Sequence, residues 1–427
     1  MIKIYDMETL EEREILFRGG SGVDVSAPVA EILRAVQERG DAALREYTLR
    51  FDGAAPDALA VTAEEVDQAA AQVEPAFLAV LEEAAERIRA YHARQKRESF
   101  VMTEREGVVL GQRIIPLARV GIYVPGGTAA YPSTVLMNAI PARIAGVGEI
   151  IMVTPPGRDG AVNPHILAAA KIAGVTRIYK VGGAQAVAAL AYGTGTIPQV
   201  DKIVGPGNAY VAEAKRQVFG RVNIDMIAGP SEVLVLADGR SNPAWVAADL
   251  LSQAEHDRMA AAVLVTDSRP LAEAVAHELE RQLAALPRAE IARASLEANG
   301  KLIVCRDLRE GIAVANRIAP EHLELCVDNP FDYLGEIQNA GSVFLGRYNP
   351  EPMGDYFAGP NHTLPTMGTA RFYSPLSVDD FVKKSQFSYY TRDALARDYR
   401  KVSLFARKEG LDAHARAVDI RFEGGEA

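Results

Sequence analysis

Through the first hundred residues of the chain, apolar residues recur every three or four positions among Ala, Glu and Arg. Residues 26–47 and 62–96 carry this spacing, which predicts helices. Thr62 followed by Glu65 has the form of a capping box, and residues 51–56 form a turn between the helices. This helical N-terminal region carries no candidate chemistry, so we interpret it as scaffold or oligomer surface.

From about residue 111 the pattern changes to short runs of β-branched residues. Each run ends in a glycine or proline turn and is followed by a helix, which is typical of a parallel sheet covered by helices. The runs lie at residues 119–124, 149–153, 177–181, 202–204, 232–237, 261–266, 301–305 and 341–345. Two sheets divided near Gly229 and Pro230 fit this series better than one wide sheet. After about residue 381 we predict a charged, helical tail without a strand.

These patterns predict an α/β fold with two Rossmann-like parallel-sheet domains, a helical N-terminal region and a helical C-terminal tail. Of the 427 residues, 48% are hydrophobic and 24% are charged, and the net charge is −10 without a cluster of Lys and Arg. This charge argues against nucleic acid or a membrane surface as a partner. Cys305 and Cys326 are too few for a disulfide framework or a thiolate metal cage. Because the sequence has no signal-peptide core and no apolar run of membrane length, we expect a cytoplasmic enzyme.

Three glycine loops in the first α/β unit are candidates for binding a nucleotide. They are residues 125–127, 182–183 and 205–208, and each stands between a strand and a helix. Backbone N–H groups at such a turn can approach a phosphate closely. None of the three has the spacing of a dinucleotide fingerprint or of a Walker loop, so simple tight turns are an equally good interpretation.

Four of the seven histidines stand near carboxylate or amide residues, and all four follow residue 250: His256, His322, His362 and His414. The other three lie in helical patterns among polar neighbours, and we interpret them as solvated or capping residues: His92, His165 and His277. Each of the four, taken alone, is more simply a hydrogen-bonded structural histidine. Together they favour a shared polar site. Without a cysteine cluster, zinc or a similar ion bound by nitrogen and oxygen is the natural candidate.

The neighbours of these histidines indicate which chemistry the site could perform. Gln253 and His256 are three residues apart on a predicted helix, a spacing suited to two ligands of one metal. Glu321 beside His322 could supply two proton-transfer groups to one substrate. Ser231 lacks the surroundings of a nucleophile elbow, so we interpret it as a substrate contact. Two further pairs lie in a Gly/Pro-rich loop and in the tail: Asp355 with His362, and Glu409 with His414.

Nine segments occur in a fixed order along the chain: residues 123–127 (YVPGG), 181–185 (VGGAQ), 205–208 (GPGN), 228–232 (AGPSE), 251–256 (LSQAEH), 319–322 (APEH), 359–362 (GPNH), 374–381 (SPLSVDDF) and 409–414 (EGLDAH). Each segment alone is a weak signal. Together they resemble the histidinol dehydrogenase family, and the resemblance covers essentially the whole chain.

The resemblance implies a role for each candidate residue. It implies one zinc ion per subunit, held by four residues: Gln253, His256, Asp355 and His414. It implies an acid/base pair that also contacts the substrate: Glu321 and His322. Besides this pair and the zinc ligands, three residues would bind the substrate: Ser231, His362 and Glu409. NAD would be held by one residue at each glycine loop: Tyr123, Gln185 and Asn208.

The resemblance also implies an activity and an assembly. The activity is the four-electron oxidation of L-histidinol to L-histidine through bound L-histidinal, with two NAD+, as the last step of histidine biosynthesis. Family members are homodimers in which the C-terminal tail reaches the partner's active site. The domains that we predict are an N-terminal helical segment (1–18), a first α/β domain with a helical part and a metal and catalytic part (19–122 and 233–376), a Rossmann-like NAD-binding domain (123–232) and the tail that reaches the partner (377–427).

Three other hypotheses stay open. A relative of the family could oxidise another small primary alcohol, such as a sulfonated diol, although Ser231, His362 and Glu409 all match histidinol binding. A zinc hydrolase could use Glu321 and His322 to activate water, but the glycine loops would then have no role. The third hypothesis is a non-catalytic nucleotide-binding protein, in which the intact pair of Glu321 and His322 would have no role.

Overall fold

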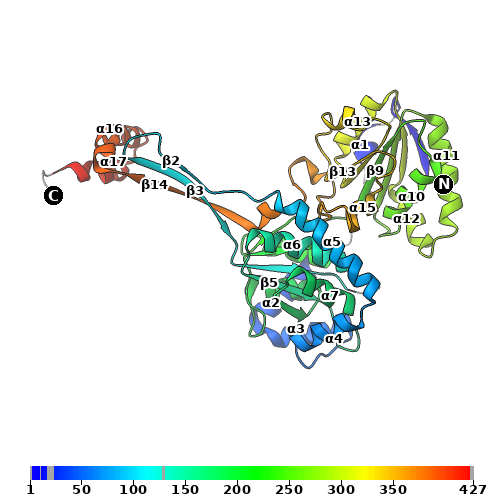
Figure 1. Cartoon of the computed structure of the whole chain (residues 1–427), viewed down its shortest axis with the longest axis horizontal. Helices are drawn as coiled ribbons and strands as arrows, with labels where there is room; N and C mark the ends of the chain where they lie inside the picture. Colours follow the sequence, from blue (N-terminus) through cyan, green and yellow to red (C-terminus); the bar gives the residue numbers. More distant parts are fainter. Residues whose placement is uncertain (1, 10, 17–23, 127–129, 424–427) are drawn as a thin grey trace. The chain divides into compact units, whose positions relative to one another are not determined.

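The computed structural model describes residues 2–9, 11–16, 24–126 and 130–423, and the chain divides into two compact units. Unit 1 comprises Met1–Lys96 and Leu117–Phe381, and unit 2 comprises Arg97–Pro116 and Val382–Ala427. Figure 1 shows the helices and strands of each unit. None of the described helices is both long enough and apolar enough to span a membrane.

The first sheet of unit 1 has six parallel strands in the order β1-β11-β10-β9-β12-β13. Strands β9 and β10 lie in the centre of the sheet and are buried along their whole length, and apart from Glu232 and Thr266 at their ends they are apolar, as expected of strands covered on both faces. The strands are β1 (Lys3–Asp6), β9 (Glu232–Ala237), β10 (Ala261–Thr266), β11 (Lys301–Val304), β12 (His322–Cys326) and β13 (Ser342–Leu345).

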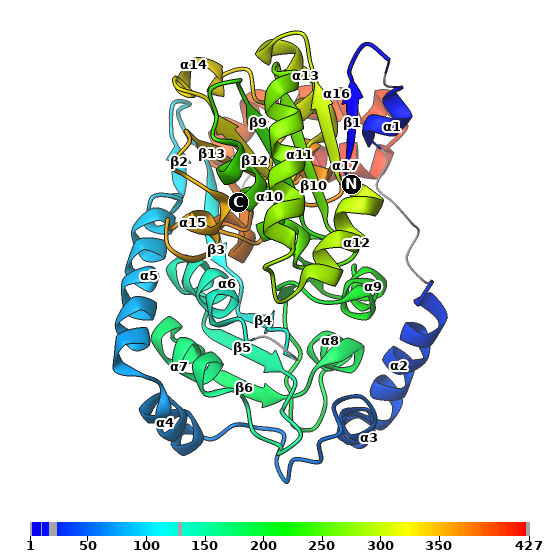
Figure 2. The ribbon, with the colours of Figure 1, turned by 90° about the vertical axis from the view of Figure 1, so that its right-hand side faces the viewer.

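Helices cover both faces of the six-stranded sheet (Figure 2). One hydrophobic core joins the sheet to three helices: α10 (Pro243–Ala254), α11 (Arg269–Leu283) and α12 (Ala289–Asn299). The core on the opposite face joins it to α1 (Glu12–Leu16) and α13 (Leu308–Ile318). Two short helices follow β12 and β13: α14 (Phe331–Leu334) and α15 (Glu351–Tyr356).

The second sheet of unit 1 has five parallel strands in the order β6-β5-β4-β7-β8. The strands are β4 (Arg119–Tyr123), β5 (Glu149–Thr154), β6 (Arg177–Lys180), β7 (Lys202–Val204) and β8 (Asn223–Ile224). The helices between and after these strands are α6 (Pro132–Ala145), α7 (Pro164–Ala173), α8 (Gly183–Tyr192) and α9 (Ala209–Val218). Four N-terminal helices pack around this sheet: α2 (Ser26–Arg39), α3 (Asp41–Asp52), α4 (Ala63–Gln72) and α5 (Pro75–Ala93).

Unit 2 is an antiparallel ribbon joined to a helical pair (Figure 1). Its strands lie in the order β14-β3-β2, and they are β2 (Phe100–Met102), β3 (Val108–Pro116) and β14 (Val382–Tyr390). The helices are α16 (Arg392–Lys408) and α17 (Asp412–Asp419), followed by the 3-10 turn η3 (Ile420–Phe422). Two other 3-10 turns, η1 (Thr369–Arg371) and η2 (Val378–Phe381), belong to unit 1.

The α/β class with two parallel sheets is confirmed. The division expected near Gly229 falls between β8 of the second sheet and β9 of the first. Strands β7, β9 and β10 coincide with predicted runs, and the capping box of Thr62 and Glu65 is present at the start of α4. These elements are specified by local patterns, so the sequence is sufficient to find them.

Both ends of the chain contain the expected helices, α1 at the N-terminus and α16 and α17 in the tail, but each also contains a strand that was not expected. The segment predicted as helical at residues 1–18 contains the edge strand β1, and the tail predicted at residues 377–427 contains the strand β14. Both strands are largely or partly exposed, so neither shows the alternation of a half-buried strand. The apolar pattern also misses β12, because His322 and Glu324 interrupt it.

The N-terminal helices differ from the prediction in length and in packing. Each predicted helix is two helices, because Gly40 at φ +54° separates α2 from α3 and Pro75 starts α5. The domain prediction grouped residues 19–122 with residues 233–376, whereas α2 and α3 share a core with the five-stranded sheet, and α4 and α5 pack on α7 and α6. Apolar spacing shows which face of a helix is buried but not which sheet buries it.

Gly205 and Gly220 provide a matched test of local packing, because both have a positive φ, +113° and +97°. A Cβ at Gly205 would lie 2.1 Å from the Tyr123 carbonyl oxygen, whereas nothing lies within 4 Å of a Cβ at Gly220. We expect Gly205→Ala to cost about 3–5 kcal/mol of unfolding free energy and the control Gly220→Ala about 1–2 kcal/mol. Urea unfolding measures both, and equal losses would contradict the packing argument.

Candidate active site

A cleft of about 340 Å³ opens in unit 1 between residues of the two parallel sheets. From the six-stranded side it is lined by seven of the residues singled out in the sequence: Ser231, Gln253, His256, Glu321, His322, Asp355 and His362. From the five-stranded side, Pro125, Gly126 and residues 205–207 of two glycine loops line it. The fold therefore brings together three of the four candidate histidines.

Parallel strand pairing explains why residues far apart in sequence meet here. Ser231 directly precedes β9, and Glu321 directly precedes β12. The two strands are neighbours, and His322 pairs in register with Val233, so both strands begin at the same edge of the sheet. The remaining residues come from three other segments: Gln253 from the last turn of α10, His256 from just beyond it, Asp355 from α15 and His362 from the loop after α15.

The backbone of Glu232, the first residue of β9, orients the predicted acid/base pair. Its N–H donates to Glu321 Oε2 at 2.9 Å, and its carbonyl accepts a hydrogen bond from His322 Nδ1 at 2.9 Å. Because a carbonyl oxygen only accepts, Nδ1 carries the proton of neutral His322 and Nε2 is the basic nitrogen. Nε2 is buried and has no hydrogen-bond partner among the described residues.

Burial decides the protonation states in the cleft. It lowers the pKa of His322 and of His362, because an imidazolium ion loses its hydration there. It raises the pKa of Glu321 well above its usual range, although the hydrogen bond from the Glu232 N–H opposes this shift. A neutral imidazole can accept a proton and a carboxyl group with a high pKa can donate one, so the pair suits general acid–base chemistry.

His362 has the same arrangement of ring nitrogens as His322. Its Nδ1 donates to the Asp355 carbonyl oxygen at 3.1 Å, which leaves Nε2 as the acceptor nitrogen. The Asp355 carboxylate lies 3.7 Å from the same Nδ1 and 4.0 Å from His322 Nε2. Asp355 therefore stands between the two imidazoles.

Side chains that could hold a metal ion lie close together at this cleft, two of them in its lining and one, Glu351, outside it. His322, Glu351 and Asp355 each offer a ligand atom, and these atoms lie within 4.8 Å of one another. The buried Gln253 Oε1 has no hydrogen-bond partner within the described ranges. Because buried polar atoms normally have a partner, this oxygen is suited to bind a ligand. A donor set of nitrogen and oxygen without thiolate suits zinc or a similar divalent ion.

Glu351 is the member of this group that the sequence analysis missed. Burial raises its pKa to about 10, and the charge of Asp355 adds to the shift. Glu351 and Asp355 are four residues apart on α15, a spacing that could have revealed their shared face. Of the predicted zinc ligands, Gln253, His256 and Asp355 line the cleft, whereas His414 belongs to unit 2.

The predicted NAD contacts lie at the carboxyl ends of β4, β6 and β7, which share one edge of the five-stranded sheet. Tyr123 ends β4, and its buried hydroxyl accepts a hydrogen bond from the Gly183 N–H at 3.1 Å. Gln185 on α8 is buried, and neither of its amide atoms has a partner in the described part of the chain. Asn208 caps α9 by accepting two backbone N–H bonds of its first turn.

A larger cavity, of about 1020 Å³, lies next to this edge of the sheet. The residues that follow β5 and those that end α3 contribute to its lining, among them Pro155, Phe51 and Asp52. Burial raises the pKa of Asp52 to about 6, and its Oδ2 has no hydrogen-bond partner among the described residues. Of the first predicted glycine loop, Gly127 lies outside the described residues.

A buried ion pair holds the third glycine loop. Lys215 of α9 and Asp225 are paired, and both side chains are almost fully buried. Lys215 Nζ donates to the Gly205 carbonyl at 3.0 Å, and the Gly205 N–H donates to Asp225 Oδ2 at 2.8 Å. Both peptide groups of Gly205 are therefore bonded to one ion pair, which fixes the loop beside the cleft.

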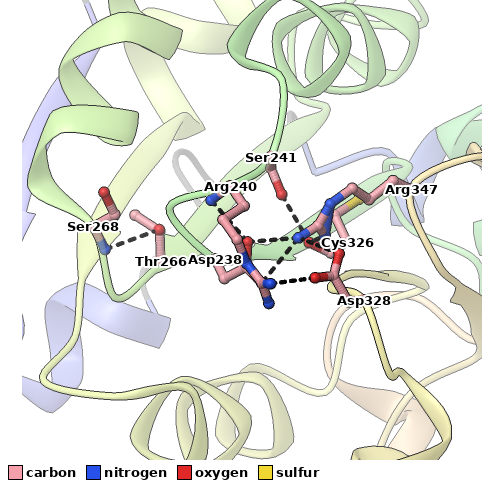
Figure 3. Close-up of polar contacts among 8 residues, drawn as sticks. All are labelled: Asp238, Arg240, Ser241, Thr266, Ser268, Cys326, Asp328 and Arg347. Atoms are coloured by element: carbon pink, nitrogen blue, oxygen red, sulfur yellow. Dashed lines mark hydrogen bonds and ion pairs between the residues drawn. The ribbon is translucent and has the colours of Figure 1, made fainter.

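At the carboxyl edge of the six-stranded sheet, residues that follow β9, β12 and β13 are bonded to one another (Figure 3). Arg347 donates to both carboxylate oxygens of Asp238 at 2.7 and 2.9 Å and to the Cys326 carbonyl at 2.6 Å. It also pairs with Asp328 at 3.0 Å. The strand order reverses at this point, where open parallel sheets commonly bind ligands. Here side chains that bond to one another fill the position.

Glu409 and His414, the predicted residues of the tail, lie in unit 2. Both line a groove of about 850 Å³ on α16 and α17, together with apolar residues such as Phe405 and Leu411. Phe405 and Leu411 are exposed within this chain. The groove is thus an apolar surface that carries two polar groups able to bind a ligand.

The interpretation of His92 as a solvated or capping residue is wrong. It is fully buried at the end of α5 and has hydrogen-bond contacts at both ring nitrogens. The helical pattern gave no signal of this, because its partner Asn361 lies far away in sequence. His277 is exposed, and His165 is partly exposed beside Glu74, in keeping with their interpretation.

Comparison with known proteins agrees with this geometry. A sequence model described as histidinol dehydrogenase matches residues 19–422. The chain belongs to the histidinol dehydrogenase family. The histidinol dehydrogenase of Geobacter sulfurreducens is 58% identical over 414 residues, 96% of each chain, and that of Listeria monocytogenes serotype 4b is 55% identical over 416 residues, 97% of each. The crystal structure of the histidinol dehydrogenase from Elizabethkingia anophelis has a TM-score of 0.94 at 40% identity, covering 99% of this chain and 98% of that one.

Membership of the histidinol dehydrogenase family makes this chain an NAD-dependent oxidoreductase of histidine biosynthesis. The interpretations as a hydrolase or as a non-catalytic nucleotide-binding protein are therefore wrong. Both rested on single parts of the chain, whereas the family match covers the cleft and the glycine loops together.

The ion pair beneath the Gly205 loop predicts a non-additive effect on stability. Lys215→Met leaves the buried Asp225 carboxylate unpaired, so we expect it to cost about 3–5 kcal/mol of unfolding free energy. The double variant Lys215→Met/Asp225→Leu removes both charges and should regain most of that loss. Urea unfolding of the three proteins checks this, and a double variant less stable than Lys215→Met would contradict it.

Proposed function

We propose that the enzyme oxidises L-histidinol to L-histidine through bound L-histidinal, in two steps that each reduce one NAD+, as the last step of histidine biosynthesis. The observation that carries this proposal is the free Nε2 of His322, held in a polar cleft beside Glu321. We also propose one zinc ion per subunit and a cytoplasmic location. The alternative, a related enzyme for another small primary alcohol such as a sulfonated diol, has no observation in its favour.

His322 acts as the general base of the first step. Its Nδ1 proton is held by the Glu232 carbonyl, so Nε2 is the nitrogen that takes the hydroxyl proton of the alcohol. Burial keeps the ring neutral before the reaction, which leaves this nitrogen able to accept. NAD supplies the hydride acceptor for the carbinol carbon in each step.

Glu321 acts in the second half of the reaction. The aldehyde must add water before it can lose a second hydride. Ionised Glu321 would accept the proton of this water, because a carboxylate whose pKa is raised is a stronger base. Its Oε2 lies 3.6 Å from His322 Nδ1 and accepts a hydrogen bond from the Glu232 N–H at 2.9 Å, so the two side chains lie next to each other, and both line the cleft. Retaining the aldehyde in the cleft between the steps keeps a reactive species from solvent.

Zinc would be held by four residues: Gln253, His256, Asp355 and His414. When bound, it would act as a template that binds the nitrogen atoms of histidinol and orients the substrate. Three residues would add substrate contacts: Ser231, His362 and Glu409. Five of these seven residues line the cleft of unit 1, and the buried, unpartnered Gln253 Oε1 supports the metal assignment. Tyr123, Gln185 and Asn208 would hold NAD at the carboxyl edge of the five-stranded sheet.

Glu409 and His414 would complete the site of a second copy in a homodimer. The support is the nature of their surroundings, because both line an apolar groove in unit 2 whose Phe405 and Leu411 are exposed in the single chain. An exposed apolar surface of this kind is usual where protein partners meet. The tail of each chain would then supply one zinc ligand and one substrate contact to its partner.

The reaction predicts a stoichiometry that depends on the metal. We expect two NADH per L-histidinol consumed, with activity lost on stripping by EDTA and restored by zinc, because one ion holds the substrate through both steps. Absorbance of NADH against histidine formed measures this. One NADH per substrate would mean that the enzyme stops at the aldehyde. No NADH with histidinol but turnover of a sulfonated diol would favour the alternative.

A shared active site predicts complementation between two inactive enzymes. A His322→Ala dimer lacks the base and a His414→Ala dimer lacks a tail ligand, so each should be almost inactive. Each mixed dimer contains one intact site. Complete exchange of equal amounts makes half of the dimers mixed, so we expect up to about a quarter of wild-type activity to return. Proven exchange without any recovery would place the tail in the site of its own chain.

A further inference from the structure

His92, at the end of α5, belongs to a buried hydrogen-bond network outside the proposed catalytic set. Its Nδ1 lies 2.7 Å from Gln95 Oε1, and its Nε2 lies 3.4 Å from Asn361 Nδ2. Gln95 Oε1 also accepts a bond from the Val378 N–H at 3.1 Å, which identifies this atom as the amide oxygen. Nδ1 of His92 therefore carries the proton, and Nε2 is the acceptor that faces Asn361.

Every polar atom of the Asn361 side chain takes part in this network. Nδ2 donates to the Met137 carbonyl at 2.6 Å as well as facing His92, and Oδ1 accepts from the Thr363 N–H at 2.9 Å. A carbonyl only accepts and an N–H only donates, so the amide has a single orientation. A protonated His92 would present a donor to the Asn361 donor. Burial, which lowers the pKa of His92, favours the neutral ring that this contact needs.

The network fixes the loop that carries His362. Asn361 and Thr363 flank His362 in sequence and both are buried, and His362 lines the cleft together with Thr363. The same loop packs closely against α5. At Gly359 there is no room for a side chain, because a Cβ there would lie 2.8 Å from the Arg87 carbonyl oxygen. His362 is therefore attached through its neighbours to α5 and α6 and through its own Nδ1 to α15.

We propose that His92 is a positioning residue for histidinol, acting through Asn361 on His362. His92 does not line the cleft, so it affects where His362 lies rather than the chemistry itself. This inference rests on the proposed function, in which His362 contacts the substrate. The glycine loops proposed for NAD make no contact with this network among the described hydrogen bonds, so NAD binding should not depend on it.

The test compares variants of the full-length enzyme in steady-state kinetics. His92→Leu leaves an Asn361 N–H without an acceptor, so we expect KM for histidinol to rise about tenfold or more, with KM for NAD+ changed less than about twofold. His92→Gln retains an acceptor oxygen and should fall between His92→Leu and wild type. His277→Leu, a substitution of an exposed histidine on α11, is the matched control and should behave as wild type.

The outcomes separate positioning from general destabilisation. A selective rise in KM for histidinol with partial rescue by His92→Gln supports the proposal. A parallel rise in both KM values with a lower Tm, or no change in either, overturns it. If His92→Leu does not fold, His92→Gln and Asn361→Ala carry the same comparison. Calorimetric titration of the wild-type enzyme with histidinol does not depend on these variants. If the wild-type enzyme did not bind histidinol, the proposed function would be overturned instead.

Discussion

The candidate site depends on the backbone of one residue, Glu232. Its N–H donates to Glu321 and its carbonyl accepts from His322, so one residue of β9 orients the proposed acid/base pair and selects the imidazole tautomer. This is possible only because β9 and β12 are parallel neighbours whose first residues align. A register shift of one residue would turn the side chains of β12 to the opposite faces of the sheet. The register between the buried strands β9 and β12 thus sets the positions of Glu321 and His322 at the edge of the sheet.

Much of the site could be predicted because its residues occupy conspicuous positions in local motifs. Ser231 follows a Gly-Pro turn before an apolar run, and Glu321 with His322 follows a proline. The motifs name these residues without showing how they meet. The register between β9 and β12 is a long-range property, and β12 itself lacks the apolar pattern of a buried strand.

Other residues could not be found because their roles arise from distant contacts. Glu351 gains its proximity to His322 Nε2, 3.7 Å, from the packing of α15 against the sheet. His92 has an ordinary helical context, and its burial follows from a loop more than 260 positions later. The packing of α2 and α3 on the five-stranded sheet is of the same kind. Local sequence determines the elements, whereas their burial partners are set by tertiary structure.

The two parallel sheets contribute opposite edges to the cleft. Residues from the carboxyl ends of β4 and β7, including Gly126 and Gly205, face residues from the amino ends of β9 and β12. The carboxyl edge is where a parallel sheet commonly presents backbone N–H groups to a ligand, and in the six-stranded sheet that edge is filled by Arg347 and Asp238. The glycine loops that we propose to bind NAD therefore face the amino edge of the other sheet, which holds the proposed acid/base pair. In the proposed reaction, this division would allow NAD to exchange at one wall of the cleft while the substrate stays bound at the other through both oxidation steps.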